Sequence, residues 1–453
     1  MKIAILGGGL AGVTAAYQLA RLRADGINVD ATLFEAGPRL GGIIETVRLG
    51  GFTIECGPEA WLSDKPWAGE LAEELGLALL PSLDAQRKTY LLRQTAEGRH
   101  LEAIPEGMRL MVPGNLAAVE NSPLLSEDAK RAYREEPLRA AELKSAIPEA
   151  DESVAGFVRR HFGDEVMRTF AAPLLAGVFG GDVEALSVRA VMPALVQMER
   201  EHGSLIAALA AKRSGSPQSA VFTTLRDGMA ALINAMALHL GDLRLNSPVT
   251  SLQAAGAQWM VGYAGTSEVF DAVLIATPAE VTSALLQDID AEAAALLPRD
   301  ASSAAIVALA FTESLSLPAG FGFLTLPETR SPLLAATFIH QKFAGRVPPD
   351  GAMLRAFFSG EQWMAAGDAE LKQLALSELR SILGELPSPQ LAIVRRWPRS
   401  LPQYAVGHAE RIAALMARLP AGLRLIGNAY HGVGIPDLIR DARLAARELT
   451  ASA

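Results

Sequence analysis

The pattern of apolar positions in the first 35 residues predicts a strand, a helix and a second strand. Residues 2–6 form a short apolar run, and apolar side chains between residues 15 and 20 then follow at helical spacing. Residues 31–34 form a second apolar run that ends at the acidic Glu35. This order is the layout of the first unit of an α/β domain that binds a dinucleotide.

The turn between the first strand and the helix carries glycines at G-x-G-x-x-G spacing. Gly7 permits the sharp turn, Gly9 lets a pyrophosphate approach the backbone, and Gly12 lets the helix lie close to the sheet. The start of the helix offers free N–H groups and the positive end of the helix dipole to phosphates. Glu35 lies 23 residues after Gly12, where an acid that binds ribose hydroxyls is expected. We therefore expect cofactor contacts from Gly7, Gly9, Leu10, Ala11, Gly12 and Glu35.

Farther along the chain the pattern changes twice. Helical spacing dominates from residue 110 to 213, and a predicted exposed loop follows at 214–219. Strands and helices alternate again from residue 221 onward. The other predicted elements are a helix over 66–80, a strand over 88–93, strands within 300–395, a helix over 367–384, a buried strand over 423–426 and a terminal helix.

Composition and charge narrow the class of protein. The 453 residues are 50% hydrophobic, which is enough for two or three cores. The net charge of −9 argues against a nucleic-acid partner. The single cysteine, Cys56, fits a reducing cytoplasm, and no cysteine or histidine cluster predicts a metal site. Without a cleavable leader or a run near ~20 apolar residues, we expect a soluble or peripheral cytoplasmic protein.

The segment after Glu35 favours FAD over NAD. It reads "AGPRLGG", from Ala36 to Gly42, and resembles an extension found in the amine-oxidase-like flavoproteins. In that resemblance Arg39 contacts FAD, and Gly41 and Gly42 bring the backbone to the flavin side. An NAD site has no need of this segment.

The chain as a whole is therefore expected to be an α/β protein. It has a discontinuous Rossmann-like FAD-binding domain, an inserted mixed-sheet substrate domain and a helical insert. The predicted boundaries are 1–75, 220–285 and 390–453 for the FAD-binding domain, 76–109 and 286–389 for the substrate domain, and 110–219 for the helical insert.

Five further blocks resemble one family, the oxygen-dependent protoporphyrinogen and coproporphyrinogen oxidases. They are "GGFTIECGPEAWLSDKP", the stretch from Asp151 to Pro193, "GFGFLTLPE" with "FAGRVPPDG", "RRWPRSLPQYAVGH" and "GNAYHGVGIPDLI". Together they extend from one end of the chain to the other. The second and last blocks are typical of these enzymes rather than of flavoproteins in general.

The resemblance implies further cofactor contacts. Val249 stands at a predicted strand edge, where its backbone would bind an adenine, although an ordinary sheet residue has the same pattern. Trp397 would lie against the cofactor, although a lone tryptophan is more often part of a core. The "HGVGIP" loop would present N–H groups to the flavin, or would serve only to reverse the chain. The other implied contacts are Ala36, Gly57, Pro58, Glu59, Ala60, Gly427, Val433, Gly434 and Ile435.

The resemblance also implies a site for a porphyrinogen, a mostly apolar macrocycle with carboxylate arms. Ala176 and Gly177 would line the pocket opposite the flavin, with Leu324 and Leu326 as walls. Phe338 would stack on the macrocycle, or would belong to a core. The basic residues that would bind the carboxylate arms of the substrate depart from the family pattern. Thr89 stands where a basic residue is common in the family. Lys88 is the substitute we name as a substrate contact, and Arg87 shares the face of Thr89 in a strand.

In that family FAD takes a hydride from a meso carbon, and O2 reoxidises the flavin to give hydrogen peroxide. No residue of this chain is placed convincingly as a general base, so no catalytic residue is assigned. Thr89 favours protoporphyrinogen IX over coproporphyrinogen III, which stays the alternative. Three other functions remain as alternatives: a flavin amine oxidase, a carotenoid-type desaturase and a flavin-binding protein without turnover.

Partners follow from the same resemblance. We expect a homodimer, a hand-off of product to a ferrochelatase, and weak contact with the inner face of the cell membrane. That contact would use the helical insert and its basic residues Lys130, Arg131 and Arg134. The insert is equally well interpreted as a lid over the substrate.

Overall fold

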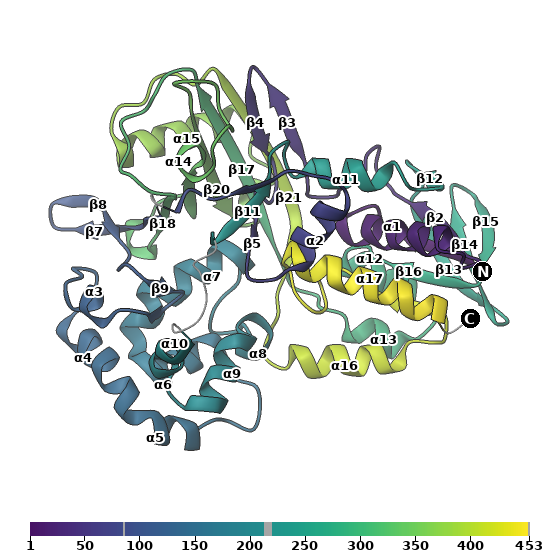
Figure 1. The fold of residues 1–453 in the computed structure, drawn as a ribbon, viewed down its shortest axis with the longest axis horizontal. Helices are drawn as coiled ribbons and strands as arrows, with labels where there is room; N and C mark the ends of the chain where they lie inside the picture. The colour runs from purple at the N-terminus through teal and green to yellow at the C-terminus, as the bar shows by residue number, and fades with distance from the viewer. Residues whose placement is uncertain (85–86, 213–219, 452–453) are drawn as a thin grey trace.

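The computed structural model describes residues 1–84, 87–212 and 220–451, and the chain forms three parts (Figure 1). One part is built on a parallel sheet, the second on a mixed sheet and the third on helices. The predicted loop at 214–219 falls outside the described residues.

The first part contains a five-stranded parallel sheet. Its central strands are apolar apart from the exposed Lys2, and residues 3–6 and 272–275 are fully buried. Continuous apolar strands of this kind are typical of parallel sheets that are covered on both faces. The strand order is β12 (Asp242–Arg244), β2 (Asp30–Phe34), β1 (Lys2–Leu6), β16 (Ala272–Ile275) and β22 (Leu423–Leu425).

Helices and a small antiparallel sheet cover the two faces of this parallel sheet. In Figure 1 the C-terminal helix lies beside the first helix, so the two ends of the sequence meet in one layer. The first face is covered by α1 (Leu10–Ala24), α2 (Trp67–Glu74), α11 (Ala230–Ala237) and α17 (Ile435–Ala451). The second face is covered by β13 (Val249–Ala255), β14 (Gln258–Tyr263), β15 (Thr266–Phe270), α12 (Ala279–Leu286), α13 (Ala291–Leu296) and α16 (His408–Arg418).

A seven-stranded mixed sheet forms the second part. Helix α15 (Asp368–Leu383) covers one face with a stripe of Leu371, Ala375 and Leu379, which are spaced four residues apart. The strand order is β21 (Leu391–Pro402), β17 (Ala301–Phe311), β20 (Ala352–Ser359), β19 (Ala335–Phe338), β18 (Gly322–Thr325), β7 (Thr89–Thr95) and β8 (Gly98–Ala103).

The structure differs from the predicted domain boundaries at two points. Strand β21 pairs with β17 over most of its length, so residues 391–402 belong to the mixed sheet and not to the cofactor-binding part. Helix α13 packs on the parallel sheet, although it was expected within the substrate domain. The partner of β21 lies far away in the sequence, where local patterns carry no information, whereas α13 packs on the preceding helix and on a distant one, residues 408–418.

Short elements join these two parts. The ribbon of β3 and β4 packs its apolar side chains, including Phe52 and Ile54, against the mixed sheet. The ribbon and the other connectors are β3 (Thr46–Leu49), β4 (Phe52–Glu55), β5 (Trp61–Leu62), β6 (Leu79–Pro81), β11 (Phe222–Leu225) and α14 (Ile339–Lys342). The short helices η4 (Pro327–Thr329) and η5 (Glu361–Trp363) lie against strands of the mixed sheet.

The helical insert has its own apolar core. Serine side chains accept hydrogen bonds from backbone N–H groups at the starts of three of its helices, namely Ser126, Ser153 and Ser187. The elements are β9 (Met108–Arg109), β10 (Val112–Pro113), α3 (Leu116–Glu120), α4 (Glu127–Glu135), η2 (Glu136–Arg139), α5 (Ala140–Ser145), α6 (Val154–Val166), η3 (Met167–Ala171), α7 (Ala172–Phe179), α8 (Val188–Val191), α9 (Pro193–His202) and α10 (Leu205–Lys212).

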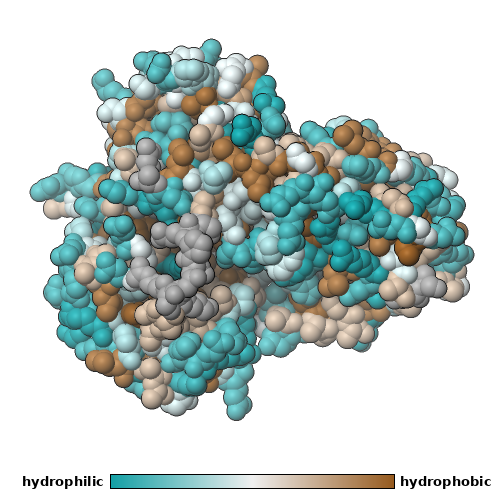
Figure 2. All heavy atoms as spheres, in the orientation of Figure 1, coloured by the Kyte–Doolittle hydropathy of each residue, from teal (hydrophilic) through white to brown (hydrophobic). Residues whose placement is uncertain are grey.

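The order of elements confirms the predicted α/β character and the mainly helical segment from residue 110 to 212. Within that segment the helical stretch from Val154 to Phe179 is divided, because Gly163 has a non-helical backbone and a π-helical turn follows it at Met167–Ala171. On the face shown in Figure 2 hydrophilic residues predominate, and hydrophobic residues lie in small groups between them.

Candidate active site

The glycine turn at the start of α1 is fixed by its surroundings. A Cβ atom on Gly12 would lie 1.9 Å from the carbonyl oxygen of Gly7, and one on Gly7 would lie 2.7 Å from that of Ala276. Gly9 differs, because an added Cβ would meet nothing within 4 Å. Gly9 is also the N-cap of α1 and no side chain caps this helix, which leaves its first N–H groups for an anion.

Glu35 closes the loop that follows β2. Its two carboxylate oxygens accept hydrogen bonds from the N–H groups of Gly8 and Gly37, each at 2.7 Å. Each oxygen keeps a lone pair that can accept a further hydrogen bond from a ribose hydroxyl. The backbone N–H of Ser247 donates to the Glu35 carbonyl at 2.9 Å. Val249, at the start of the edge strand β13, is therefore brought near this acid.

The segment from Ala36 to Gly42 folds back over the glycine turn. The N–H of Gly41 donates to the carbonyl of Gly8 at 2.8 Å, and a Cβ on Gly42 would lie 3.3 Å from the Cα of Gly9. The Arg39 guanidinium donates to three carbonyls of its own loop, among them that of Gly42 at 2.6 Å. Arg39 thus orders the loop, and its contact with FAD stays a prediction.

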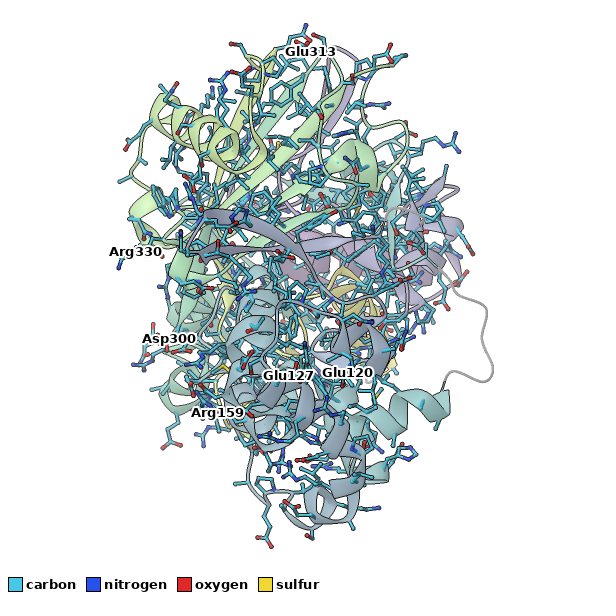
Figure 3. All side chains as sticks on the ribbon, turned by 90° about the vertical axis from the view of Figure 1, so that its left-hand side faces the viewer. Glu120, Glu127, Arg159, Asp300, Glu313 and Arg330 are labelled. Carbon is cyan, nitrogen blue, oxygen red and sulfur yellow. The ribbon has the colours of Figure 1, made fainter. Side chains whose placement is uncertain are left out.

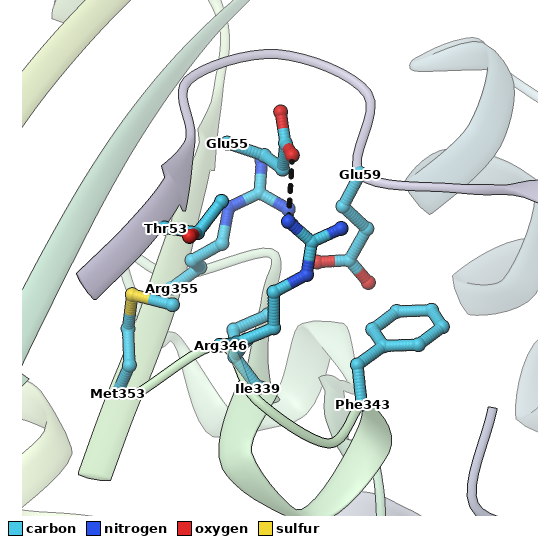
Figure 4. A pocket seen from close by; sticks show the side chains of 8 residues that line it. All are labelled: Thr53, Glu55, Glu59, Ile339, Phe343, Arg346, Met353 and Arg355. Atoms are coloured by element: carbon cyan, nitrogen blue, oxygen red, sulfur yellow. Dashed lines mark hydrogen bonds and ion pairs between the residues drawn. The ribbon is translucent and has the colours of Figure 1, made fainter. Parts of the chain in front are cut away.

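The segment from Gly57 to Ala60 is held from two sides. A Cβ on Gly57 would lie 1.8 Å from the carbonyl oxygen of Ile43, so only glycine fits there. From the mixed sheet, the indole N–H of Trp397 donates to the carbonyl of Cys56 at 2.7 Å. The Glu59 carboxylate pairs with Lys342 and Arg355, so a cofactor role for this residue would fall to its backbone. Figure 4 shows Glu59 and Arg355 with the neighbouring charged side chains of Glu55 and Arg346.

The loop before α17 forms the opposite border of the site. Gly427 has a φ of +132°, which favours glycine, and the space in front of it is open. Val433 packs against the core of the helical insert, which places this loop beside the insert. The Asp437 carboxylate lies in the first turn of α17, 3.0 Å from where a Cβ on Gly434 would stand, and pairs with Lys65 at 2.6 Å.

Tyr404 holds this loop in place. Its hydroxyl donates to the carbonyl of Asn428 at 2.7 Å and accepts from the N–H of Gly432 at 3.0 Å. Its ring stacks on His408, with the ring centroids 4.0 Å apart. Its own carbonyl accepts from the N–H of Ser187 at 2.7 Å, which connects the loop to the insert.

We predict that Tyr404→Phe lowers the affinity for FAD. The variant leaves the N–H of Gly432 and the carbonyl of Asn428 without a partner, and one such buried group costs ~1–3 kcal/mol. Part of this energy would appear as weaker binding, about tenfold for each 1.4 kcal/mol. Titration of the apoprotein with FAD measures the effect. Tyr90→Phe is the control, because Tyr90 donates only to Ala319 at the exposed end of β7. Equal affinities for the two variants would contradict the prediction.

The face of the mixed sheet opposite α15 offers an apolar wall. Five residues on neighbouring strands stand side by side and form what we term the apolar row: Leu91, Leu324, Ala335, Phe357 and Ile306. Helix α7 of the insert lies over this wall, since a Cβ on Gly177 would be 3.6 Å from Leu324 Cδ2. The predicted substrate residues Ala176, Gly177 and Leu324 are thus brought together.

A second row, two residues along the same face, contains Thr89. Its cross-strand neighbours are Gly322, Thr337 and Arg355 in turn, and we term these four the polar row. The one cation of this row, Arg355, is buried and bound to Glu59. Lys88 and Arg87 are exposed and lie before β7 begins at Thr89, so alternation along a strand does not order them.

Phe338 does not face the predicted substrate site. It is fully buried in the core between the mixed sheet and α15, where its ring contacts that of Phe323. Because successive residues of a strand point to opposite faces, Thr337 and not Phe338 faces α7. The expected stacking of Phe338 on a macrocycle is therefore corrected, and the core alternative holds.

These features fit FAD. The helix N-terminus without a side-chain cap and the open space at Gly9 suit a pyrophosphate, and the acid at Glu35 suits a ribose. The open space at Gly427 lies at the end of β22, beside the same sheet edge. When bound, FAD supplies two-electron redox chemistry.

Comparison with known proteins agrees with this geometry. The family model "Flavin containing amine oxidoreductase" matches residues 10–450. The chain belongs to this family. FAD is accordingly its cofactor, as the glycine turn and the "AGPRLGG" segment predict. Only the contacts of single residues with FAD stay predictions.

Within the flavin-containing amine oxidoreductases, two curated relatives match over their full lengths. Coproporphyrinogen III oxidase of Bacillus subtilis is 30% identical and covers 98% of this chain and 96% of its own. Protoporphyrinogen oxidase of Homo sapiens is also 30% identical and covers 98% and 97%. A crystal structure from Exiguobacterium sp. 255-15, described as "Putative protoporphyrinogen oxidase", has a TM-score of 0.87 at 29% identity and covers 100% and 99%. The resemblance to this group of oxidases is confirmed.

The structure gives no support to membrane contact through α4. The three basic residues of this helix are each paired with an acid, which leaves little net positive charge for an anionic membrane. The pairs are Lys130 with Glu127 at 3.1 Å, Arg131 with Asp128 at 2.7 Å, and Arg134 with Glu120 at 2.7 Å. Figure 3 shows Glu120 and Glu127 on the insert. Within the described part of the chain, every helix is too short or too polar to cross a bilayer.

Several residues of the site were missed from the sequence. Tyr404, Asp437 and Lys65 hold the last loop, and their local sequence gives no sign of it. Arg355 and Lys342 hold the segment after Gly57. Arg355 does carry a signal, since it interrupts the otherwise apolar strand "AMLRAFFS". A charge inside a buried strand needs a partner, and this could have been recognised.

Proposed function

We propose that this chain oxidises a porphyrinogen to the corresponding porphyrin, with O2 as the electron acceptor. The observation that carries the proposal is the likeness, over whole chains, to relatives named for this reaction on two different porphyrinogens. Removal of six hydrogens from the substrate would consume three O2 and yield three H2O2. The step belongs to haem synthesis, in the cytoplasm.

The geometry of the chain supports a large apolar substrate. The apolar row forms a flat wall, and Gly177 allows close approach from the opposite side. Residues of the chain would thus bind and orient the macrocycle and exclude water, while ring N–H protons leave to solvent. The residues that we propose as walls are Leu91, Ala176, Gly177, Leu324, Ala335, Phe357 and Ile306.

Protoporphyrinogen IX is the substrate that we propose first. The polar row has threonine at the position where a cation is common, and its arginine is already bound to Glu59. Fewer free cations favour the substrate with fewer carboxylates. Coproporphyrinogen III is the alternative, and the names of several bacterial relatives favour it.

The proposal is tested by adding each porphyrinogen to the FAD-loaded protein under air. Porphyrin fluorescence and H2O2 should rise together, at three H2O2 for each porphyrin. Faster turnover of one porphyrinogen would identify the substrate. Bound flavin without turnover on either compound would overturn the proposal, and oxidation of putrescine or benzylamine instead would favour an amine oxidase.

A variant of Gly177 tests where the substrate binds. In Gly177→Leu the new side chain would enter the space between α7 and Leu324, so we expect KM to rise at least tenfold with an unchanged flavin spectrum. Gly69→Leu is the control, because Gly69 also lies in a helix and its added Cβ would meet nothing within 4 Å. An unchanged KM in Gly177→Leu would exclude this wall as part of the site.

A further inference from the structure

A cluster of charged side chains is buried where the cofactor-binding part meets the mixed sheet (Figure 4). Glu55 and Glu59 come from the end of β4 and the segment after it, on the cofactor side. Lys342, Arg346 and Arg355 come from α14, the loop after it and β20. The side chains of all five are at most 12% exposed. We term these five residues the junction cluster.

The junction cluster binds the segment that carries Gly57. Arg355 donates to the Glu59 carboxylate at 2.5 Å and also to the carbonyl of Gly57. Lys342 donates to the other oxygen of Glu59. Arg346 pairs with Glu55 at 3.2 Å and donates hydrogen bonds to Thr224 and to the carbonyl of Leu225.

The charges of the junction cluster do not balance. It contains three cations and two carboxylates, which leaves one positive charge without a counterion within the cluster. The Nε of Arg355 is buried and has no hydrogen-bond partner among the described residues. Buried charges in proteins are ordinarily paired, so an excess of this kind favours a negative group nearby.

A short series of packing contacts connects the cofactor side of the junction cluster to the glycine turn before α1. Gly57 packs against the carbonyl of Ile43, and the preceding Gly42 packs against Gly9 at the start of α1. The neighbouring carbonyl of Cys56 is bound by Trp397. The excess positive charge therefore lies beside the segment from Gly57 to Ala60, for which the resemblance implies contact with the cofactor.

We propose that the junction cluster raises the reduction potential of the bound flavin and that Arg355 is its positioning residue. When two electrons enter a flavin with one proton, the ring gains a negative charge. If the ring is bound on the other side of the Gly57–Glu59 segment, a fixed positive charge in the junction cluster would stabilise that form relative to the neutral oxidised form. Arg355 acts through the Gly57–Glu59 segment, whose place it fixes. The benefit for turnover rests on the proposed function, whereas the effect on potential does not.

The test is the midpoint potential of the FAD-loaded protein, measured without porphyrinogen. Arg355→Met removes a positive charge and should lower the potential, with at least a tenfold fall in the ratio of reduced to oxidised flavin at a fixed ambient potential. Glu59→Gln removes a negative charge and should raise the ratio by a similar factor. The double variant restores the wild-type charge and should return the potential close to the wild-type value.

The signs of the two shifts in midpoint potential distinguish an effect of charge from a purely structural role of these side chains. Loss of packing would move both single variants in the same direction, and that result, or no shift in either, would overturn the proposal. Arg346→Lys is the control, because it keeps the charge, is equally buried and does not touch the Gly57 segment. If Arg355→Met fails to fold, Lys342→Met removes a charge at a side chain bound to Glu59 and repeats the sign test.

One further variant tests positioning separately. Arg355→Lys keeps the charge but loses the paired donors to Glu59 and Gly57. We expect a near wild-type potential and a kcat about tenfold lower, with KM little changed. A wild-type kcat would remove the positioning role and leave the electrostatic one. Absence of turnover in the wild type would refute the proposed function without affecting the measured potentials.

Discussion

Gly9→Ala is expected to weaken FAD binding at least 100-fold while the apoprotein stays folded. The backbone of Gly9 has a φ of −70°, which alanine adopts without strain, and an added Cβ meets no protein atom within 4 Å. The methyl group would instead occupy the space in which the pyrophosphate approaches the start of α1. We expect the Kd for FAD to rise at least 100-fold, which corresponds to about 2.7 kcal/mol. The measurement is a titration of the apoprotein with FAD, together with its thermal unfolding.

Gly12→Ala, three residues farther along the chain, is expected to have the opposite effect on the fold, because it should destabilise the apoprotein. Its Cβ would lie 1.9 Å from the carbonyl oxygen of Gly7, so α1 would have to move away from the sheet. Overpacking of this kind costs ~1–3 kcal/mol or more, and we expect a lower melting temperature of the apoprotein. A wild-type Kd in Gly9→Ala would contradict a pyrophosphate at Gly9, and equal stability of the two variants would contradict the close approach of α1 at Gly12.

The difference between these two glycines shows what the sequence can reveal. The spacing of Gly7, Gly9 and Gly12 between two apolar runs predicts the turn, because the turn, the helix and the close approach are all local. The same holds for strands β1 and β16, whose continuous apolar runs predict a covered parallel sheet. Local pattern was sufficient where, as in the glycine turn, the deciding contacts lie close together in the sequence.

The errors come from contacts that are distant in sequence. Alternation indicates that Ala336 and Phe338 share one face of β19 and Thr337 faces the other way, but not which face α15 covers. In the same way, β21 carries a strand pattern without any sign that its partner is β17. Partners of buried charges are equally hidden, since Glu59 is separated from Arg355 by 296 residues.

The helical insert contains a buried charge network that makes its stability depend on pH. The imidazole of His161 lies between the carboxylates of Glu136 and Glu199, at 2.9 and 3.0 Å, and its side chain is fully buried. Glu136 also accepts from the N–H of Leu205 at 2.7 Å, which caps α10. Since α6 leads through η3 into α7, this network supports the helix that carries Gly177 over the apolar row.

His161→Gln is expected to destabilise the insert most strongly at low pH. Burial alone would lower the pKa of His161, but the hydrogen bonds that its imidazole makes to the carboxylates of Glu136 and Glu199 outweigh burial and raise the pKa above 6.5. A raised pKa means that the stabilisation is complete below pH 6.5 and is lost as the pH rises through the higher value. Removal of one partner from a buried ion pair costs ~3–5 kcal/mol.

Urea unfolding of both proteins at pH 5.5, 6.5 and 8.5 checks this prediction. The difference between wild type and His161→Gln should be greatest at pH 5.5 and should shrink at pH 8.5, as the wild-type imidazolium loses its proton. His202→Gln is the control, because His202 lies in the same insert but is 40% exposed and 3.8 Å from its acid. A difference that is constant with pH would mean that His161 is neutral and contributes through packing and hydrogen bonds alone. The position of α7 would then owe nothing to the charge of this network.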